Sequence, residues 1–297
     1  MTTKNQQQKQ LKGKILFLHG YTQNSSIFYA KTSALRKKIL KLGYKCKYLN
    51  GPYVLTPADL PTTDSLSKFG STTSGDVTYR GWWIKNDHTN NKVDLDKSIE
   101  SLKDYINKGI IIPDDEIENG ELQKDDEEDQ ELPIVGIIGF SQGASFAGLI
   151  AENFQKIFST SSQLKFVILY SGFKLDTSAK SGNEKYDSFY ENQNSELRYL
   201  HIYGELDTVV DETRSLSLYN ITTTKSDLLK HPGGHFVPNS KMYIDQVVNW
   251  IQSLTKEEEK AGETNGGDNS DKLKNGKSTE KNDIDSLLDM MEGFGKA

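Results

Sequence analysis

Residues 136–143 read Gly-Ile-Ile-Gly-Phe-Ser-Gln-Gly, and this stretch decides the fold that we expect. It contains the pattern Gly-x-Ser-x-Gly, in which a serine occupies a sharp turn between a buried strand and a helix, with its hydroxyl at the edge of a sheet. Glycines flank serines in many ordinary turns, so the context of the pattern matters. Here an apolar run precedes it at 132–138, and apolar residues follow at helical spacing between 144 and 154. This order predicts a nucleophile at Ser141.

Apolar runs and helical patterns alternate along the remaining chain. Strands are expected at 14–18, 45–49, 132–138, 164–170, 197–203 and 227–231. Helices are expected at 31–42, 95–108, 142–156, 213–219 and 240–253. Such alternation is typical of a mostly parallel sheet covered by helices on both faces. We therefore predict an α/β fold with a sheet of about six strands.

Charge is distributed unevenly along the chain. The net charge is -6, but residues 113–131 carry -10 and residues 256–297 carry -4, which leaves +8 on the rest. A lysine-covered, solvated surface explains this excess, and attraction of anionic substrates is the alternative. Segments with few apolar residues and like charges are usually disordered. We therefore expect a disordered N-terminus over 1–13, a folded domain over 14–255 with an acidic disordered insertion over 114–131, and a disordered tail over 256–297.

The end of the tail has a different pattern, because apolar residues recur there at helical spacing: Ile284, Leu287, Leu288, Met291 and Phe294. This pattern predicts a short helix over 283–294. The helix either docks on a protein partner or forms only transiently, since about twelve residues make a marginal helix alone.

Several classes of protein are disfavoured by composition. No apolar run approaches the roughly 20 residues of a membrane span, and the polar N-terminus resembles neither a signal nor a transit peptide. Cys46 is the single cysteine, which excludes an internal disulfide and a thiolate metal cluster and suits a reducing compartment. The sequence contains no cluster of basic residues with interleaved aromatic residues, which is the pattern expected for a nucleic-acid partner. We expect a cytoplasmic location, with the nucleus as an additional one.

A serine hydroxyl needs a base to accept its proton and an acid to orient that base. In α/β-hydrolases these residues follow the serine in the order Asp or Glu, then His. Asp207 lies three residues beyond Gly204, where a predicted strand ends, and His235 follows the loop Pro-Gly-Gly at 232–234. We therefore expect Ser141 as nucleophile, His235 as base and Asp207 as the orienting acid.

Other residues compete for these roles. Glu205 and Asp211 are alternatives to Asp207, although a turn residue or a helix cap is the simpler role for them. His231 and His235 have the i, i+4 spacing of zinc ligands on a helix, but the Pro-Gly-Gly between them prevents a regular helix and no further ligand cluster is evident. We expect no metal and no cofactor.

An oxyanion needs two converging backbone N–H groups. One belongs to the residue after the nucleophile, Gln142, and the other to a loop after an early strand, where Tyr21 follows the buried run 15–18. His19 is then expected to brace this loop and not to act as a base. His201 alternates into the sheet and is expected to be a core residue.

Four motifs in order carry a resemblance to a known family. The motifs are residues 17–24 (Phe-Leu-His-Gly-Tyr-Thr-Gln-Asn), 80–83 (Arg-Gly-Trp-Trp), 136–143, and 231–238 (His-Pro-Gly-Gly-His-Phe-Val-Pro). With these motifs the chain resembles the fungal "family of serine hydrolases", which is itself similar to the human ovarian-cancer-associated esterase and to thioesterases that release polyketide chains. The resemblance covers about 14–254. It implies a compact α/β-hydrolase fold without a large separate cap, with Ser141, Asp207 and His235 at the family's triad positions.

Aromatic residues of two long loops are candidates for a substrate pocket. Trp82 and Trp83 either line an acyl pocket or anchor their loop in the core. Tyr186, Phe189 and Tyr190 either close the other side or form a satellite hydrophobic cluster.

We expect a serine esterase or acyl-thioesterase acting on a small-molecule acyl ester or thioester. The alternatives are a lysophospholipase or peptidase, and a catalytically idle scaffold that binds an acyl ligand or a protein partner. Three candidate residues in the required order favour an enzyme.

Overall fold

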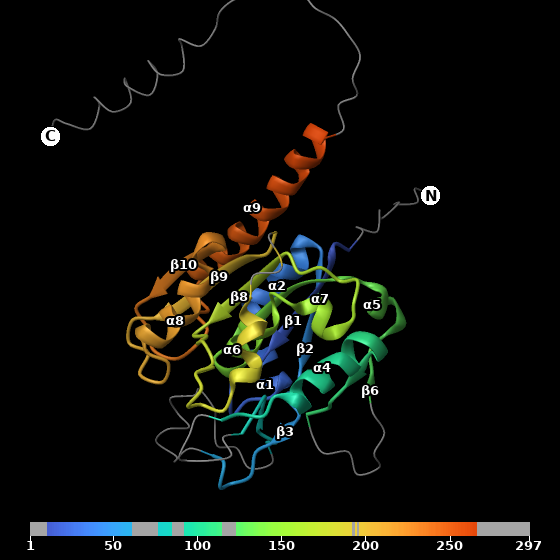
Figure 1. The fold of residues 1–297 in the computed structure, drawn as a ribbon. Coiled ribbons are helices and arrows are strands. Elements are labelled where there is room, and N and C mark those ends of the chain that lie inside the picture. The colour runs from blue at the N-terminus through green and yellow to red at the C-terminus, as the bar shows by residue number, and fades with distance from the viewer. Residues whose placement is uncertain are drawn as a thin grey trace, which may run out of the picture. The chain divides into compact units, whose positions relative to one another are not determined.

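The computed structural model describes residues 11–60, 77–84, 92–114, 123–191, 194 and 196–265. Its centre is a sheet of six strands in the order β10-β9-β8-β7-β1-β2 (Figure 1). The strands are β1 (Gly13–Leu18), β2 (Tyr44–Leu49), β7 (Ile134–Phe140), β8 (Phe166–Tyr170), β9 (Arg198–Gly204) and β10 (Ser226–His231). Every neighbouring pair is parallel. The prediction of six strands in a mostly parallel sheet is confirmed.

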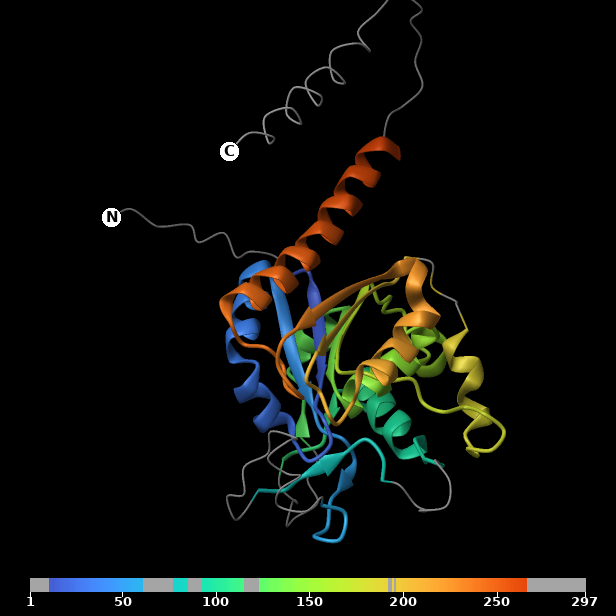
Figure 2. The same ribbon diagram turned by 90° about the vertical axis from the view of Figure 1, so that its left-hand side faces the viewer.

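Helices cover both faces of the sheet (Figure 2). On one face lie α1 (Ser25–Lys31), α2 (Ser33–Leu42) and the beginning of α9 (Lys241–Asn265). Asp245 of α9 pairs with Lys38 of α2 at 3.1 Å, and the Trp250 ring of α9 contacts the Phe166 ring edge-on. On the other face lie α4 (Asp96–Lys108), α6 (Gln142–Ile150), α7 (Phe154–Phe158) and α8 (Glu212–Thr222).

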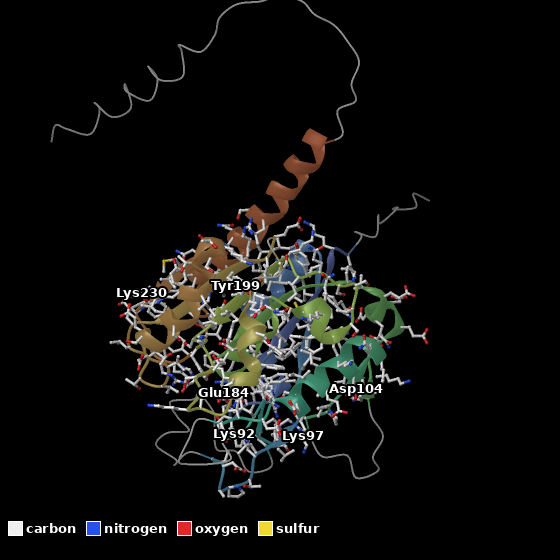
Figure 3. All side chains as sticks on the ribbon, in the orientation of Figure 1. Lys92, Lys97, Asp104, Glu184, Tyr199 and Lys230 are labelled. Atoms are coloured by element: carbon white, nitrogen blue, oxygen red, sulfur yellow. The ribbon has the colours of Figure 1, made fainter. Side chains whose placement is uncertain are left out.

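The central strands are buried along their whole length. Every residue of β1, β7 and β8 is buried, as expected for parallel strands covered on both faces. Tyr199 of β9 is completely buried, and Figure 3 shows Lys230 of the edge strand β10 at the periphery of the body. Lys230 pairs there with Glu212 at 3.2 Å. The charged edge strand limits pairing with other chains.

Two expected helices differ in the structure. The expected helix at 31–42 is α2, and α1 precedes it over residues that were not expected to be helical, with Thr32 between the two helices donating its hydroxyl to the Phe28 carbonyl at 2.7 Å. Asn24 caps the start of α1 by accepting from the Ile27 N–H at 2.8 Å. The expected helix at 142–156 is α6 followed by α7.

Short elements join the main ones, and the sequence pattern did not indicate them. Strands β3 (Tyr53–Val54) and β4 (Arg80–Gly81) form one antiparallel pair, and β5 (Ile110–Ile111) and β6 (Gln123–Lys124) form another. Helix α5 (Glu127–Glu131) and the 3-10 helices η1 (Glu184–Tyr190) and η2 (Thr223–Lys225) complete the order.

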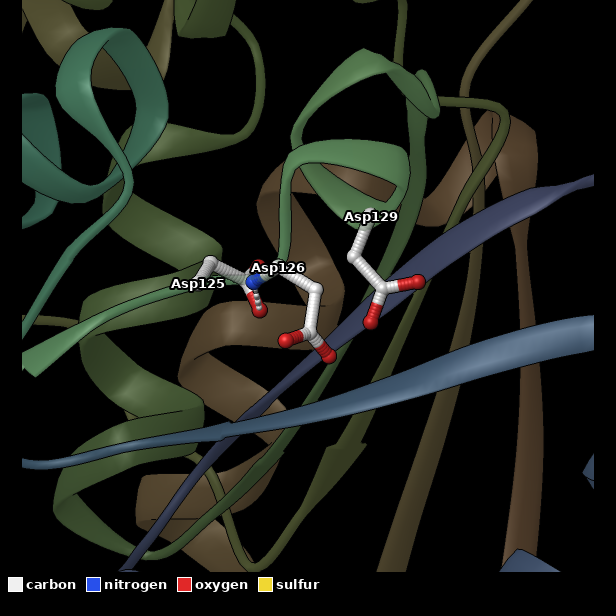
Figure 4. Close-up of side chains that lie close together, drawn as sticks. All are labelled: Asp125, Asp126 and Asp129. Atoms are coloured by element: carbon white, nitrogen blue, oxygen red, sulfur yellow. Dashed lines mark hydrogen bonds between the residues drawn. The ribbon is translucent and has the colours of Figure 1, made fainter.

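The prediction of a disordered insertion over 114–131 is wrong for its described part. Residues 123–131 contain β6 and α5, and the Asp129 side chain is almost completely buried. Residues 115–122 lie outside the described residues. Figure 4 shows Asp125, Asp126 and Asp129 gathered beside β1 and β2.

Lysines on the neighbouring strands β1 and β2 explain why the acidic segment 123–131 has a defined structure. Lys47 of β2 bonds to both Asp125 and Asp129, and Lys45 pairs with Asp129 at 3.0 Å. Lys14 of β1 donates to the Asp129 carbonyl at 2.8 Å. The composition of the segment indicated repulsion between its own carboxylates. It did not indicate that lysines from other parts of the chain bind these carboxylates.

By the contacts between its residues, the chain divides into two units, Met1–Ser253 and Leu254–Ala297. The backbone of α9 stays helical to Asn265, so the predicted disorder over 256–297 is wrong for 256–265. The predicted helix over 283–294 and most of the N-terminal segment 1–13 lie outside the described residues. Within the described ranges, no helix combines the length and apolar character needed to cross a membrane.

Candidate active site

The candidate residues lie at one edge of the sheet. Because the six strands are parallel, their carboxyl ends meet at the same edge, where α/β proteins usually bind ligands. Ser141 follows β7, Asp207 lies three residues beyond β9, and His235 lies four residues beyond β10. Residues far apart in the sequence therefore converge there.

Ser141 occupies a strained turn between β7 and α6. Its backbone has φ 52° and ψ -115°, which is uncommon for a residue other than glycine. A Cβ added at Gly139 would lie 2.5 Å from the Ala144 Cα, and one at Gly143 would lie 2.3 Å from the Leu18 carbonyl oxygen. Only glycine fits at either position. The predicted strand, sharp turn and helix are confirmed as β7, Ser141 and α6.

The structure brings Ser141, His235 and Asp207 into one hydrogen-bonded chain. Nε2 of His235 lies 3.0 Å from the Ser141 Oγ, and Nδ1 lies 2.7 Å from the Asp207 Oδ2. With the proton on Nδ1, the imidazole donates to the carboxylate and its Nε2 accepts from the serine hydroxyl. All three residues are buried, with exposures of 4% for Ser141, 6% for Asp207 and 7% for His235.

The surroundings of Asp207 keep its carboxylate ionised. Oδ1 accepts from the N–H groups of Val209 and Val210, both at 2.9 Å, and Oδ2 also accepts from the Ser171 hydroxyl at 2.8 Å. Burial acts to raise the pKa of Asp207, but the hydrogen bond and charge of His235, with these donors, outweigh it and lower the pKa. The carboxylate is thus fixed in place as an acceptor for His235.

The two alternative carboxylates have other roles. Asp211 is the N-cap of α8, where its side chain accepts from the Arg214 N–H at 2.9 Å, so the predicted helix cap is confirmed. Glu205 is exposed in the turn after β9 and lies 4.0 Å from Lys230. Asp207 is the carboxylate that bonds to His235.

Ser171 is a residue of this network that the sequence analysis missed. It follows β8, has φ 48°, and is 1% exposed. Its N–H donates to the Ile202 carbonyl at 2.7 Å while its hydroxyl reaches Asp207. A signal was available, because a polar residue at the carboxyl end of a predicted parallel strand lies at the edge where sites form.

A cavity of about 380 Å³ borders Ser141. Both residues expected to hold an oxyanion, Tyr21 and Gln142, line it. Gln142 is the first residue of α6, whose first N–H groups have no partner within the helix. Its side chain accepts from the Trp82 N–H at 2.7 Å and donates to the Trp83 carbonyl at 2.9 Å, which ties the start of α6 to the segment of the two tryptophans. The oxyanion role of the two N–H groups stays a prediction.

The two tryptophans have different places. Trp83 lines the cavity, where its ring contacts Phe173 edge-on at 6.3 Å. Trp82 is 1% exposed, stacks on Phe146 at 5.2 Å and donates from Nε1 to the His19 carbonyl at 2.9 Å. A substrate-binding role for Trp82 is therefore wrong, because its ring lies in the core and does not line the cavity, and the alternative of a core anchor applies.

The aromatic residues of the second loop belong to the core and do not line this cavity. The Tyr186 and Phe189 rings meet at 5.8 Å, the Tyr186 hydroxyl accepts from the Leu95 N–H at 3.0 Å, and the Tyr190 hydroxyl accepts from the Leu175 N–H at 2.9 Å. The alternative of a hydrophobic cluster is correct. The remaining walls of the cavity are residues that the sequence analysis missed: Phe173, Val209, Val210 and Arg214.

Two other described histidines, His19 and His201, are structural. His19 makes a hydrogen bond from Nδ1 to the Gly20 carbonyl at 2.7 Å and accepts the Gly51 N–H at 2.9 Å, and burial lowers its pKa to about 4. His201 bonds to the Thr222 hydroxyl at 3.0 Å, and burial lowers its pKa to about 3. Both stay neutral near pH 7, so the predicted bracing and core roles are confirmed.

One group of carboxylates in the described part of the chain has metal-ligand spacing, namely Asp125, Asp126 and Asp129. Lys47 already neutralises two of them, so the group serves as an ion network in the fold. The nitrogens of His235 are engaged by Ser141 and Asp207. The expectation of no metal and no cofactor stays a prediction.

Comparisons with known proteins give consistent similarities. The family model described as "Serine hydrolase (FSH1)" matches residues 9–247. "Family of serine hydrolases 3" of Saccharomyces cerevisiae is 35% identical over 298 residues, which cover 96% of this chain and 98% of that protein. "Esterase OVCA2" of Danio rerio is 29% identical over 249 residues, with 80% and 96% covered. Among solved structures, "Structure of YahD with Malic acid" is 11% identical, covers 82% of this chain and 93% of that chain, and has a TM-score of 0.52.

Proposed function

Since the chain belongs to the FSH1 family of serine hydrolases and has the α/β-hydrolase fold, we propose that it hydrolyses carboxylic esters or thioesters of acyl chains through Ser141, His235 and Asp207. The observation that carries this proposal is the hydrogen-bonded chain from Asp207 through His235 to Ser141 beside a cavity. A serine held in this way is activated for attack on a carbonyl carbon.

In the proposed reaction, the Ser141 Oγ attacks the acyl carbonyl while His235 Nε2 takes its proton. Asp207 stabilises the imidazolium, and the backbone N–H groups of Gln142 and Tyr21 hold the oxyanion. His235 then returns the proton to the leaving alcohol or thiol, which departs and leaves an acyl-enzyme. Water, deprotonated by His235, releases the carboxylic acid and restores the serine.

The walls of the cavity support an acyl substrate. Trp83, Phe173, Val209 and Val210 present apolar side chains next to Ser141, and such walls favour a hydrocarbon chain. The zebrafish relative is named an esterase. A lysophospholipase or peptidase activity is the alternative substrate class. An idle scaffold is disfavoured, because binding alone does not need a serine aligned with a histidine and a carboxylate.

The partner and the location that we propose rest on the sequence. A small-molecule acyl ester or thioester is the proposed substrate, and a protein partner is proposed for the C-terminal segment 256–297. A cytoplasmic location, with the nucleus in addition, is proposed from the single cysteine.

A substrate panel tests the proposed function. Matched p-nitrophenyl esters, acyl thioesters and p-nitroanilides of two to ten carbons are given to the intact protein and to Ser141→Ala. We expect turnover of esters or thioesters by the intact protein and loss of that turnover, by several orders of magnitude, in the variant. Ser159→Ala is the matched control, because Ser159 also has a positive φ, 51°, outside this site. Turnover that survives in Ser141→Ala, or cleavage of anilides alone, contradicts the proposal.

A further inference from the structure

Arg214 of α8 is held against the cavity that contains Ser141. Its guanidinium carbon lies 4.2 Å from the centre of the Phe173 ring, and Nη1 donates to the Val209 carbonyl at 3.0 Å. Phe173 and Val209 themselves line the cavity. A solvent-exposed cation is thus held at the wall by residues that form that wall.

The side chain of Arg214 has unused capacity to bind an anion. Within the described residues its side chain contacts a carbonyl group and a ring, and the charges of Asp211 and Asp207 act on the guanidinium without a hydrogen bond or ion pair to it. Asp211 accepts the backbone N–H of Arg214, and Asp207 bonds to His235. A guanidinium has five N–H donors and stays charged in proteins, so several donors remain for a ligand.

The position of His235 indicates that the acyl part of a substrate, and not its leaving group, lies next to Arg214. His235 borders a second cavity, of about 300 Å³, with Phe28 and Phe140 among its walls. Because the histidine returns its proton to the leaving group, the leaving group belongs near His235. The cavity of Ser141, Gln142 and Arg214 is then on the acyl side.

We propose that Arg214 is a specificity residue that selects acyl groups with a short hydrocarbon segment ending in a carboxylate. The apolar walls contact the hydrocarbon, and the guanidinium binds the carboxylate with paired hydrogen bonds. The substrates are then half-esters or half-thioesters of dicarboxylic acids. This inference rests on the proposed function.

The test compares two esters that differ in one terminal group, mono-p-nitrophenyl adipate and p-nitrophenyl hexanoate. The intact protein is expected to have a kcat/KM for the adipate about tenfold above that for the hexanoate, as one charge-assisted hydrogen bond allows. Arg214→Gln removes this preference, Arg214→Lys keeps part of it, and high salt weakens it. Arg198→Gln is the matched control, because Arg198 also donates to a carbonyl, that of Leu197 at 3.1 Å, at the start of β9. The Arg198→Gln variant is expected to keep the full preference for the adipate over the hexanoate.

Two results would overturn the inference. The intact protein has no preference for the adipate, or Arg214→Gln leaves the ratio of the two kcat/KM values unchanged, as it would if both esters lost the same factor because Arg214 acts through Asp207. The melting temperature of each variant is measured, and Arg214→Lys decides the question if Arg214→Gln does not fold. Hydrolysis of the hexanoate without a preference for the adipate refutes this inference alone. Hydrolysis of no ester at all refutes the proposed function as well.

Discussion

Asp207 and Asp129 are both buried carboxylates with a lowered pKa, but they have different partners. Burial opposes ionisation of each, and hydrogen bonds and charges of neighbouring residues outweigh it. Asp207 bonds to His235, whereas Asp129 pairs with Lys45 and Lys47. The first carboxylate lies at the carboxyl edge of the sheet, and the second fastens α5 to β2.

The difference shows that a buried, ionised carboxylate does not by itself mark a catalytic site. Histidine changes its charge near neutral pH, so Asp207 is coupled to a group that can transfer a proton. Burial acts to lower the pKa of Lys47, but its bonds to Asp125 and Asp129 raise it, so this lysine stays charged. The Asp129 network therefore holds the chain together, and the Asp207 network can take part in a reaction.

The largest effect that separates the two networks is expected from Asp207→Asn. The amide keeps the shape of the side chain, but Oδ1 is held by the N–H groups of Val209 and Val210, so the NH2 group faces His235 Nδ1, donates to it and favours the wrong tautomer. The neutral amide also cannot stabilise an imidazolium. We expect kcat for ester hydrolysis to fall roughly 10⁴-fold, as in an unrelated Ser-His-Asp enzyme. The measurement is steady-state turnover of the best ester in the panel. A loss below about tenfold would show that another carboxylate orients His235.

Asp129→Asn is expected to act on stability instead. It removes the charge that pairs with Lys45 and Lys47, although Lys47 keeps its bond to Asp125, and losing hydrogen bonds to a charged group costs about 2 to 3 kcal/mol of unfolding free energy. Urea unfolding measures this loss, while kcat/KM stays within about twofold. Asp104→Asn is the control, because its pair with Lys108 is largely exposed and an exposed pair contributes little to stability. A large loss of activity with no loss of stability would place Asp129 in the reaction.

A third prediction concerns pH and a histidine outside the site. His201 has its pKa lowered to about 3, so the unfolded chain binds a proton at pH 5 that the folded chain does not. Its contribution to stability is complete above about pH 6.5 and decreases as the pH falls toward 3. Between pH 7.5 and pH 5 this costs about 2 kcal/mol, which His201→Gln should remove from the pH dependence of urea unfolding. An unchanged pH dependence in the variant would contradict the prediction.

Ser171→Ala is expected to give the smallest effect and to sharpen the comparison within the Asp207 network. The variant removes one donor to Asp207 Oδ2 but leaves His235 bonded to that oxygen. We expect kcat to fall about tenfold, since a hydrogen bond to a charged group is worth roughly that much. KM should not change, because Ser171 does not line the cavity next to Ser141. A rise in KM alone would show a role in substrate binding instead.

The sequence predicted the parts of the molecule that depend on local pattern. The Gly-x-Ser-x-Gly turn, the strands before and after it and the chain order Ser141, Asp207, His235 all follow from residues that are close in sequence or ordered along it. Parallel strands then bring their carboxyl ends together without further information.

The features that the sequence did not predict depend on contacts between distant segments. Order at Asp129 comes from lysines on β1 and β2, more than 80 residues earlier in the chain. Trp82 and Trp83 face opposite sides of an irregular segment, whose register no alternation of apolar residues indicates. The cavity walls Phe173 and Val209 come from loops after β8 and β9, and loop conformation is not specified by helix or strand periodicity.

The most direct test of the central claim is covalent labelling with a fluorophosphonate, followed by mass-spectrometric location of the label, because it detects an activated serine whatever the substrate is. The account predicts a label on Ser141 that is lost in Ser141→Ala and strongly reduced in His235→Ala. Ser159→Ala should label like the intact protein, although Ser159 also has a positive φ. A folded intact protein that takes no label, or takes it on another serine, or labels equally fast in His235→Ala, would contradict the account.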